Sequence, residues 1–427
     1  MDYVEATSSL LDYTKNSRRA TASKATRVKS PATNGNTFNA GQQIIFQLPS
    51  NVKNTFLDGE SLFLRFPFTS TNATVKFEGS CGAYSLINKI EVLTDGQTIV
   101  SLDNYAELLS IFADLEAAAD AKDNRLAIMH GMNSDRFAGK AVNAGSYTFC
   151  LPLHLTMFMS AVHYIPLFSR SSLQIRITLN NANKAVICSG ESIENDELSI
   201  NLPEVCYRQI EVNNEAMQMI NENCGGVYSL NVKDFRHIQY TVPASENVAN
   251  FTHTLGFSMS SLESLYVACI SVPSQTNKAL PSNSNRQAVF NEFSLLLNGE
   301  RIPSRQILGR DPAELMTELC IAERSLGTFH YPSSINGEAS TFELTSVQAT
   351  GDASATTGSN VMCVDLESMR PKDEGDMYAG ISTIGQNLTA EWNTPGEILE
   401  SNVHYYSCGT VNLELDMNSA QVWVVSV

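Results

Sequence analysis

Alternating apolar and polar positions run through most of the chain, and two short stretches with this pattern are close to copies of each other. The first, INKIEVLTDGQTIVS at 87 to 101, contains two alternating runs separated by Asp95-Gly96. The second, FNEFSLLLNGERIPS at 290 to 304, has Asn298-Gly299 at the same place, about half a chain later. Asp-Gly and Asn-Gly between such runs are strong signals for a β-hairpin. The pattern therefore predicts two hairpins in corresponding places of two related halves.

Other segments repeat in the same order around these hairpins. A helical stretch follows each hairpin, and Asn104 and Asp311 are the expected N-caps. The last matched pair is more widely spaced than the others, so we expect a long surface loop between about 332 and 360, either an exposed tower or a passive insertion. The matched pairs are ESLFL (60 to 64) with ESLYV (263 to 267), QQIIFQLP (42 to 49) with RHIQYTVP (236 to 243), NYAELLSIFADL (104 to 115) with DPAELMTEL (311 to 319), and LQIRITLNNA (173 to 182) with VNLELDMNSA (411 to 420).

The chain is predicted to be all-β and to contain two sandwich domains. Short strand signals occur at spacings typical of antiparallel sandwiches, and long helical signals are few. A length of 427 residues favours two or three domains, which two similar halves would satisfy. We expect an N-terminal arm at 1 to 40 with a helix at 2 to 13, a first β-sandwich at 41 to 212, a helical linker at 213 to 223 and a second β-sandwich at 224 to 427.

One uncharged stretch could be mistaken for a membrane span. Residues 141 to 169 contain no Asp, Glu, Lys or Arg. Pro152 and Pro166 interrupt the stretch, and a lipid-exposed helix would have to satisfy the backbone groups that these prolines disrupt. We therefore expect a buried strand-loop-strand here.

The charge is strongly negative except near the N-terminus. A formal net charge of -17 argues against nucleic-acid binding over most of the surface, because phosphate contacts need clustered Lys and Arg. No acidic residue lies between Asp12 and Asp58. The first part of this segment is poor in large apolar groups, and we expect it to be a flexible, basic arm. Two interpretations remain open: a merely solvated tail, or an inward contact with a membrane surface, nucleic acid or a neighbouring subunit. The basic residues of the arm are Lys15, Arg18, Arg19, Lys24, Arg27 and Lys29.

The cysteines and the N-terminus indicate folding inside a cell. Nine cysteines, an odd number without a C-x-x-C pair, fit neither a disulfide framework nor a zinc ribbon. The first residues, MDYVEATSSLLDY, lack the charged start and apolar core of a signal peptide. We expect reduced, buried thiols and no secretion.

No catalytic constellation stands out. The sequence contains no P-loop, Rossmann glycine fingerprint, HExxH or GxSxG motif. The dipeptides His163-Tyr164, His330-Tyr331 and His404-Tyr405 are expected to be packed or edge-strand residues. The acidic runs at 191 to 199 and 373 to 376 could hold a cation such as calcium, but they lack EF-hand spacing and are expected to be solvated loops. We therefore expect no enzyme activity and assign no catalytic, cofactor-binding or metal-binding residue.

Four segments carry a resemblance to a known family. They are LPLHLTMFMSAVHYIPLFSRSSLQIRITLN (151 to 180), FSLLLNGERIPSR (293 to 305), VMCVDLESMRPKDEGDMYAGISTIGQNLTAEWN (361 to 393), and the alternating strand at 411 to 417 with the closing SAQVWVVSV. In this order they resemble the double-jelly-roll major capsid proteins, the lineage that joins adenoviruses, tailless membrane-containing bacteriophages and large nucleocytoplasmic DNA viruses. The chain departs from that pattern where Gly380-Ile381-Ser382 replaces the usual Phe-Ser, and the first segment is rich in methionine.

The resemblance implies two tandem antiparallel jelly-roll sandwiches and a structural role in a virion. Such a chain would form a homotrimer with a pseudo-hexagonal outline and tile an icosahedral capsid, assembled inside the host cell. Its partners would be further copies of itself, minor capsid and penton proteins, and an internal membrane or the genome through the basic arm. No cofactor or small-molecule substrate is implied. The alternative is a tandem β-sandwich binding module, such as a lectin, an adhesin or a spike or penton component; a hydrolase built on a β-sandwich is a third.

Overall fold

The computed structural model describes residues 23–72, 74–142, 144–161, 163–188, 193–287, 289–309, 311–323, 325–326, 342, 358–367, 380–394, 396, 398–417 and 423–426. The expected helix at 2 to 13 and the acidic run at 373 to 376 lie outside these residues. So does the expected loop at 332 to 360, apart from residue 342 and residues 358–360.

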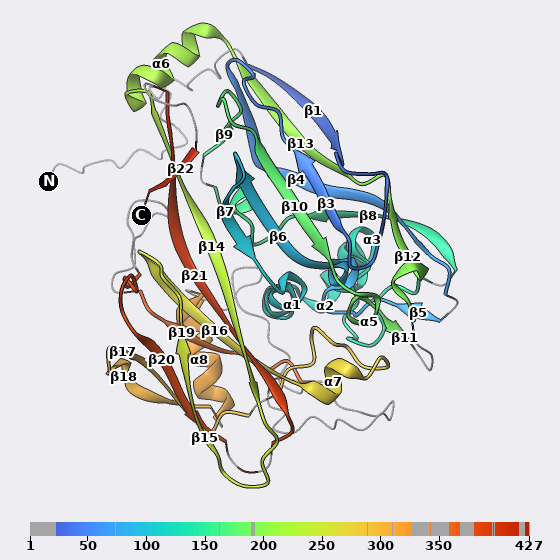
Figure 1. Cartoon of the computed structure of the whole chain (residues 1–427), viewed down its shortest axis with the longest axis vertical. Coiled ribbons are helices and arrows are strands. Elements are labelled where there is room, and N and C mark those ends of the chain that lie inside the picture. The colour runs from blue at the N-terminus through green and yellow to red at the C-terminus, as the bar shows by residue number, and fades with distance from the viewer. Residues whose placement is uncertain are drawn as a thin grey trace, which may run out of the picture.

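The first half forms a sandwich of two antiparallel sheets (Figure 1). One sheet has the order β1-β13-β4-β12-β2, with β8 and β9 also paired to β4, and the other has the order β3-β10-β6-β7. The strands of the first sheet are β1 (Ser23–Pro31), β2 (Thr37–Asn39), β4 (Thr55–Ser70), β8 (Gly145–Pro152), β9 (Ile165–Pro166), β12 (Leu198–Asn201) and β13 (Glu204–Val212). Those of the second are β3 (Gln43–Gln47), β6 (Ile87–Thr94), β7 (Gln97–Leu102) and β10 (Leu173–Leu179), while β5 (Val75–Lys76) pairs with β11 (Ile187–Cys188).

The second half repeats this architecture. One sheet has the order β14-β21-β16-β19, with β22 paired to β21, and the other has the order β15-β20-β17-β18. The strands of the first sheet are β14 (Val227–Val242), β16 (Leu262–Ser271), β19 (Met362–Asp365), β21 (Ser401–Asp416) and β22 (Trp423–Ser426). Those of the second are β15 (Asn250–Leu255), β17 (Glu292–Leu297), β18 (Glu300–Leu308) and β20 (Leu388–Asn393). In both halves, strands that are far apart in the sequence are neighbours in a sheet, as in a jelly roll.

Helices are short and fill the connections. The linker helix predicted at 213 to 223 is α6 (Asn214–Cys224), which lies between β13 of the first roll and β14 of the second. The helices predicted after the two hairpins are α1 (Tyr105–Glu116) and α8 (Pro312–Ala322). The others are η2 (Gly82–Leu86), α2 (Ala119–Ala121), η3 (Lys122–Leu126), α3 (Ala127–His130), α4 (Met157–Ser160), α5 (Ala182–Ala185), η4 (Asn195–Glu197) and α7 (Val272–Thr276).

The two predicted hairpins are confirmed, and their turns explain the Asp-Gly and Asn-Gly pairs. β6 pairs with β7 around Asp95-Gly96, and β17 pairs with β18 around Asn298-Gly299. All four turn residues have positive φ, at 48° and 81° in the first turn and 51° and 85° in the second. A type I′ turn needs positive φ at both central positions, which Asn, Asp and Gly tolerate best.

Two of the predicted segment pairs are wrong, because alternation does not say to which sheet a strand belongs. β3, which holds QQIIFQLP, corresponds by its place in the sheet order to β15, whereas RHIQYTVP lies on β14, the counterpart of β1. LQIRITLNNA lies on β10, the counterpart of β20, whereas the strand at 411 to 417 belongs to β21, the counterpart of β13. The pair ESLFL and ESLYV is confirmed, since it lies on the corresponding strands β4 and β16.

The core of each roll lies between its two sheets. Along β10, Leu173, Ile175, Ile177 and Leu179 are buried while the residues between them are partly exposed, as expected for a strand with one face on the core. The uncharged stretch at 141 to 169 contains β8, α4 and β9, as the strand-loop-strand prediction requires. No helix of the described residues is long and apolar enough to cross a membrane.

Candidate functional site

Helix α1 lies between the two rolls and contacts the second one directly. The ring of Phe112 lies 5.8 Å from that of Phe235 on β14 and 5.2 Å from that of Tyr266 on β16. Asn104 stands at the N-cap but makes no capping bond with its side chain: its Oδ1 accepts from Lys184 Nζ at 3.1 Å, and its amide nitrogen lies 3.3 Å from His237 Nδ1 of the second roll. Asp311 of α8 does cap its helix, as predicted, by accepting from the amide nitrogens of the first turn. The start of α1 is therefore used for contact between rolls.

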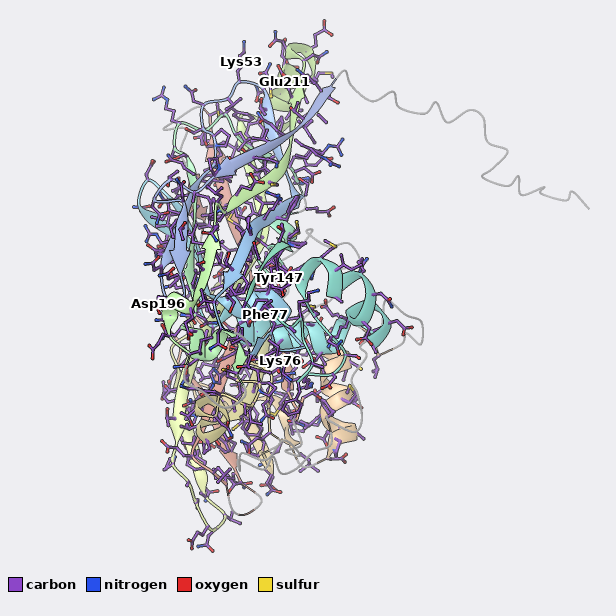
Figure 2. All side chains as sticks on the ribbon, turned by 90° about the vertical axis from the view of Figure 1, so that its right-hand side faces the viewer. Lys53, Lys76, Phe77, Tyr147, Asp196 and Glu211 are labelled. Atoms are coloured by element: carbon purple, nitrogen blue, oxygen red, sulfur yellow. The ribbon has the colours of Figure 1, made fainter. Side chains whose placement is uncertain are left out.

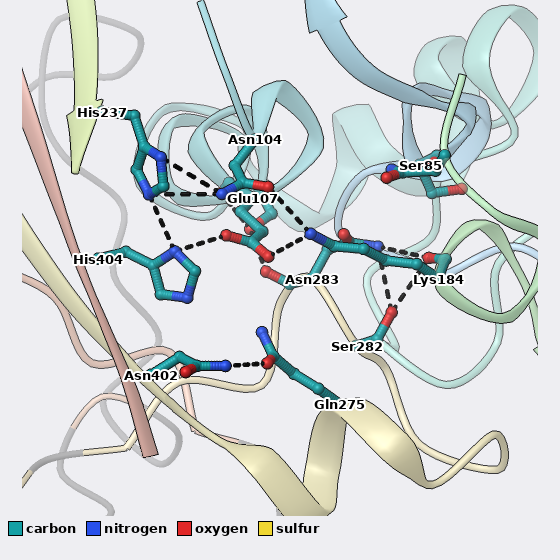
Figure 3. Close-up of polar contacts among 12 residues, drawn as sticks. Ser85, Asn104, Glu107, Lys184, His237, Gln275, Ser282, Asn283, Asn402 and His404 are labelled. Carbon is teal, nitrogen blue, oxygen red and sulfur yellow. Dashed lines mark hydrogen bonds and ion pairs between the residues drawn. The ribbon is translucent and has the colours of Figure 1, made fainter. Parts of the chain in front are cut away.

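Glu107 on α1 is the centre of a buried ionic cluster (Figure 3). Its carboxylate lies 2.7 Å from Lys184 Nζ and 2.9 Å from His404 Nδ1, and Tyr406 donates to it at 3.0 Å. Burial by itself would raise the pKa of Glu107, but the ion pairs with His404 and Lys184 outweigh burial and hold that pKa well below its ordinary value. Glu107 is therefore ionised at neutral pH and ties α1 to β21.

A second histidine extends this cluster into β14. His237 Nε2 lies 3.1 Å from His404 Nδ1, and the two rings stack with centroids 5.3 Å apart (Figure 3). Burial, followed by the charge of His404, lowers the pKa of His237 to about 3. His237 is therefore neutral at pH 7.

Asp114, also on α1, forms the second ionic cluster. It pairs with Lys122 Nζ at 2.9 Å and Arg136 Nη2 at 2.7 Å from its own roll, and with Arg286 of the second roll. Burial would raise the pKa of Asp114, but Arg136, Lys122 and Arg286 together lower it well below the ordinary value. Arg136 also donates to the carbonyl of Ser284 at 2.6 Å.

Glu78 is a third buried carboxyl, and it is held mainly by amide groups. Glu78 Oε1 accepts from Ser282 N at 2.7 Å, Asn283 N at 3.0 Å and Asn283 Nδ2 at 2.8 Å. Burial raises the pKa of Glu78, and these hydrogen bonds offset only part of the rise. The segment from Ser282 to Arg286 thus contacts both Glu78 and Asp114 of the first roll.

These three clusters together form what we call the inter-roll seam. Its members are Glu78, Glu107, Asp114, Lys184, His237, Ser282, Asn283, Arg286, His404 and Tyr406. A carboxylate beside a histidine could in principle act as an acid or base, but the side chains of Glu107 and His404 are each only 2% exposed, which leaves no room for a substrate. Removing one partner of a buried pair typically costs about 3–5 kcal/mol, whereas an apolar replacement of the whole pair is often neutral. The seam therefore joins the first roll to β14, β21 and the segment from Ser282 to Arg286 of the second roll.

Of the six basic residues predicted for the arm, three lie on a described strand and three lie outside the described residues. Lys15, Arg18 and Arg19 lie outside the described residues. Lys24, Arg27 and Lys29 lie on β1, which pairs with β13 along its whole length, so the predicted boundary of the arm at residue 40 is wrong. Lys29 Nζ lies 3.0 Å from Glu204 Oε1 on β13. Backbone pairing, which needs no apolar side chains, orders this segment.

The other residues singled out in the sequence are placed as follows. His404 is buried, as expected, whereas His163 is exposed and His330 lies outside the described residues. Of the acidic run at 191 to 199, residues 195–197 form η4 and residues 198 and 199 begin β12. Within the part of the chain that the structure describes, no group of three or more His, Cys, Asp or Glu side chains could hold a metal ion.

Sequence reasoning missed the seam. Glu107 and Tyr406 are 299 residues apart, so no local pattern connects them. The available signal was weak: Glu107 and Asp114 lie among apolar residues of a short helix, where a carboxylate on the core side needs a partner.

Comparison with known proteins finds likeness in structure and not in sequence. No protein-family model and no curated protein sequence matches the chain. A chain of the PBCV-1 virus capsid matches with 12% identity and a TM-score of 0.67, covering 97% of this chain and 99% of that one. The Faustovirus major capsid protein matches with 8% identity and a TM-score of 0.63, covering 93% of this chain and 91% of that one. The mavirus major capsid protein matches with 12% identity and a TM-score of 0.55, covering 100% of this chain and 96% of that one. The predicted fold, two tandem antiparallel jelly-roll sandwiches, is confirmed.

Proposed function

We propose that this chain is a viral major capsid protein, a structural protein that forms homotrimers with a pseudo-hexagonal outline and tiles an icosahedral shell. The observation that carries the proposal is the end-to-end match of the double roll to chains described as parts of virus capsids, which covers 97% of this chain and 99% of the PBCV-1 capsid chain. The chain then works in the virion shell and is assembled inside the host cell.

The repeated rolls suit this task. Three chains with two similar rolls each present six similar sandwiches, which can fill a hexagonal lattice position. A chain that tiles a lattice must hold its two rolls in one relative position. The inter-roll seam supports that requirement, because Glu107, Asp114 and Glu78 each bind residues of both rolls or of the opposite roll. A flexible pair of sandwiches would not define a fixed outline.

We assign no catalytic role to the chain. The carboxylate and histidine pair that resembles an acid–base site is buried, and its partners are used in holding the rolls together. Binding of a cofactor or a small-molecule substrate is not part of the proposal.

The partners we propose are further trimers, minor capsid and penton proteins, and an internal membrane or the genome through the basic residues Lys15, Arg18 and Arg19. Because β1 is a strand of the first roll, the test is deletion of residues 1–22 and not of the whole predicted arm. We expect soluble trimers that assemble shells poorly. Shells of normal yield from the truncated chain would contradict the role of the basic residues.

The native mass of the purified chain tests the proposal. Size-exclusion chromatography with light scattering should give three times the chain mass of 46.7 kDa. A monomer at every protein concentration, including conditions that promote assembly, would contradict the trimeric tile.

A further inference from the structure

One contact between the two rolls of a chain places a helix of the first roll on a sheet of the second. Helix α1 of the first roll covers the outward face of the β14-β21-β16-β19 sheet of the second roll. The residues on that face that α1 contacts are Phe235, Tyr266, His404 and Tyr406. We call this the covered face.

The first roll has a sheet with the same order, β1-β13-β4-β8, and its outward face is on the side away from the second roll. Figure 1 places β1 at the right and β17 and β18 at the left, and in Figure 2 the right-hand side of Figure 1, with β1, faces the viewer. The residues on this outward face, which we call the open face, are Arg27, Lys29, Asp58, Phe63, Arg65, Cys150, Glu204, Cys206 and Arg208.

The open face matches the covered face position by position. Phe63 in ESLFL corresponds to Tyr266 in ESLYV. Phe63 lies opposite Cys206, which lies opposite Lys29; in the second roll, Tyr266 lies opposite Tyr406, which lies opposite His237. Tyr266 is covered by the ring of Phe112, whereas Phe63 is only half-buried. The position that α1 covers on the second roll is thus partly exposed on the first.

The open face also carries an excess of positive charge. Lys29 and Arg65 share one carboxylate, that of Glu204, at 3.0 and 2.7 Å. Arg27 lies directly opposite Arg208 in the β1–β13 pair, with Asp58 opposite Arg208 on the other side. Like charges directly opposite each other destabilise a strand pair unless a counter-charge approaches. The open face thus carries four cations and two carboxylates.

Helix α8 is the second roll's counterpart of α1. It follows the β17–β18 hairpin as α1 follows β6–β7, and both helices contain the tripeptide Ala-Glu-Leu near their starts. Thr317 of α8 corresponds to Ser110 of α1, which in the seam accepts from Arg286 at 2.7 Å and donates to the Asn283 carbonyl at 3.0 Å. Thr317 is exposed, whereas the two glutamates of α8, Glu314 and Glu318, already pair with Arg305 of β18.

We propose that α8 of one copy packs against the open face of the next copy, in the way that α1 packs against the covered face within the chain. The proposal rests on the proposed trimer and names its interface. One roll-to-roll contact is then used six times around the ring, three times within chains and three times between them. Because each copy offers α8 and accepts on the open face, the contact is heterologous, and it closes into a ring when its rotation is a sixth of a turn.

Substitutions on the two surfaces test the proposal. Thr317→Arg places a bulky cation on α8 opposite a basic face, and Lys29→Glu reverses a charge on the open face. We expect each to raise the dissociation constant of the trimer about tenfold or more. The matched controls are Asn247→Arg and Lys53→Glu, at exposed positions outside the two surfaces, and they should leave the trimer unchanged.

Thiol labelling gives an independent readout in the unmutated chain. Cys150 on the open face, Cys320 on α8 and Cys224 on α6 are half-buried, whereas burial raises the pKa of Cys269 and Cys408 to about 12 and keeps them unreactive. In the trimer, we expect Cys224 to be labelled and Cys150 and Cys320 to be protected. At a protein concentration at which the Thr317→Arg chain is monomeric, all three should react.

The outcomes separate the two proposals. A trimer that tolerates Thr317→Arg and Lys29→Glu as well as it tolerates the controls, with Cys150 and Cys320 freely labelled, would overturn the interface and leave the capsid function standing. An unmutated chain that never forms trimers would overturn the proposed function and this interface with it.

Discussion

Replacing Glu107 with Gln should weaken the link between the rolls more than any similar change at the surface. Gln keeps the shape of the side chain and can still accept from Tyr406, but it loses the charge that pairs with Lys184 and His404. Breaking a buried pair costs about 3–5 kcal/mol. Because Lys184 is 29% exposed and can regain water, we take the lower end, about 3 kcal/mol, roughly a hundredfold in the unfolding equilibrium.

The assay is urea unfolding followed by tryptophan fluorescence. The chain has two tryptophans, Trp392 and Trp423, both in the second roll, so the signal reports on the partner of α1 and not on α1 itself. The control is Asp103→Asn. Asp103 is 48% exposed and pairs with Lys89 at 3.2 Å, so its loss should cost at most about 1 kcal/mol.

The pH dependence supplies a second check. The folded chain lowers the pKa of Glu107 below its ordinary value of 4.5, so the ion pairs stabilise the fold fully above pH 4.5. This contribution is lost as the pH falls below 4.5, and the difference between the unmutated chain and Glu107→Gln should shrink there. A Glu107→Gln protein that unfolds at the same urea concentration as the Asp103→Asn control at pH 7 would refute the role of the seam.

Two further predictions concern packing and charge. Gly59→Ala should lower the melting temperature by several degrees, because the new Cβ would lie 2.1 Å from the Phe158 carbonyl oxygen. The control Gly256→Ala, which has open space around its Cβ, should leave the melting temperature unchanged. Equal melting temperatures of the two variants in calorimetry would contradict this prediction. Asp114→Asn should destabilise the chain by about 3–5 kcal/mol, because it leaves three cations around a neutral amide. Arg286→Met should destabilise it less, because Asp114 stays paired with Lys122 and Arg136. The reverse order of stability in urea titrations would contradict this prediction.

The parts of the fold that the sequence predicts are those with a local physical cause. Asp95-Gly96 and Asn298-Gly299 mark hairpins because the turn itself demands positive φ. The linker helix α6 follows from Asn213, whose side chain accepts from Ala216 N, and from Gly225 at its end with φ 62°. These signals need no knowledge of the rest of the chain.

The parts that escape prediction depend on distant partners. RHIQYTVP and QQIIFQLP share an alternating pattern, but only the register of β14 against β21 and of β3 against β10 separates them. The segment at Ser23–Pro31 reads as a flexible arm because it lacks large apolar residues, yet it is held by backbone pairing with β13. The seam joins Glu107 to residues of β21, a strand close to the C-terminal end of the sequence.

The central claim is that two similar rolls, fixed at one angle by the seam, make a third of a pseudo-hexagonal tile. Electron-microscopy class averages of the purified oligomer test this claim most directly. The account predicts a six-lobed outline with threefold symmetry, in which neighbouring lobes are evenly spaced. Averages that show separate two-lobed particles, or a closed ring with a different number of lobes, would contradict it.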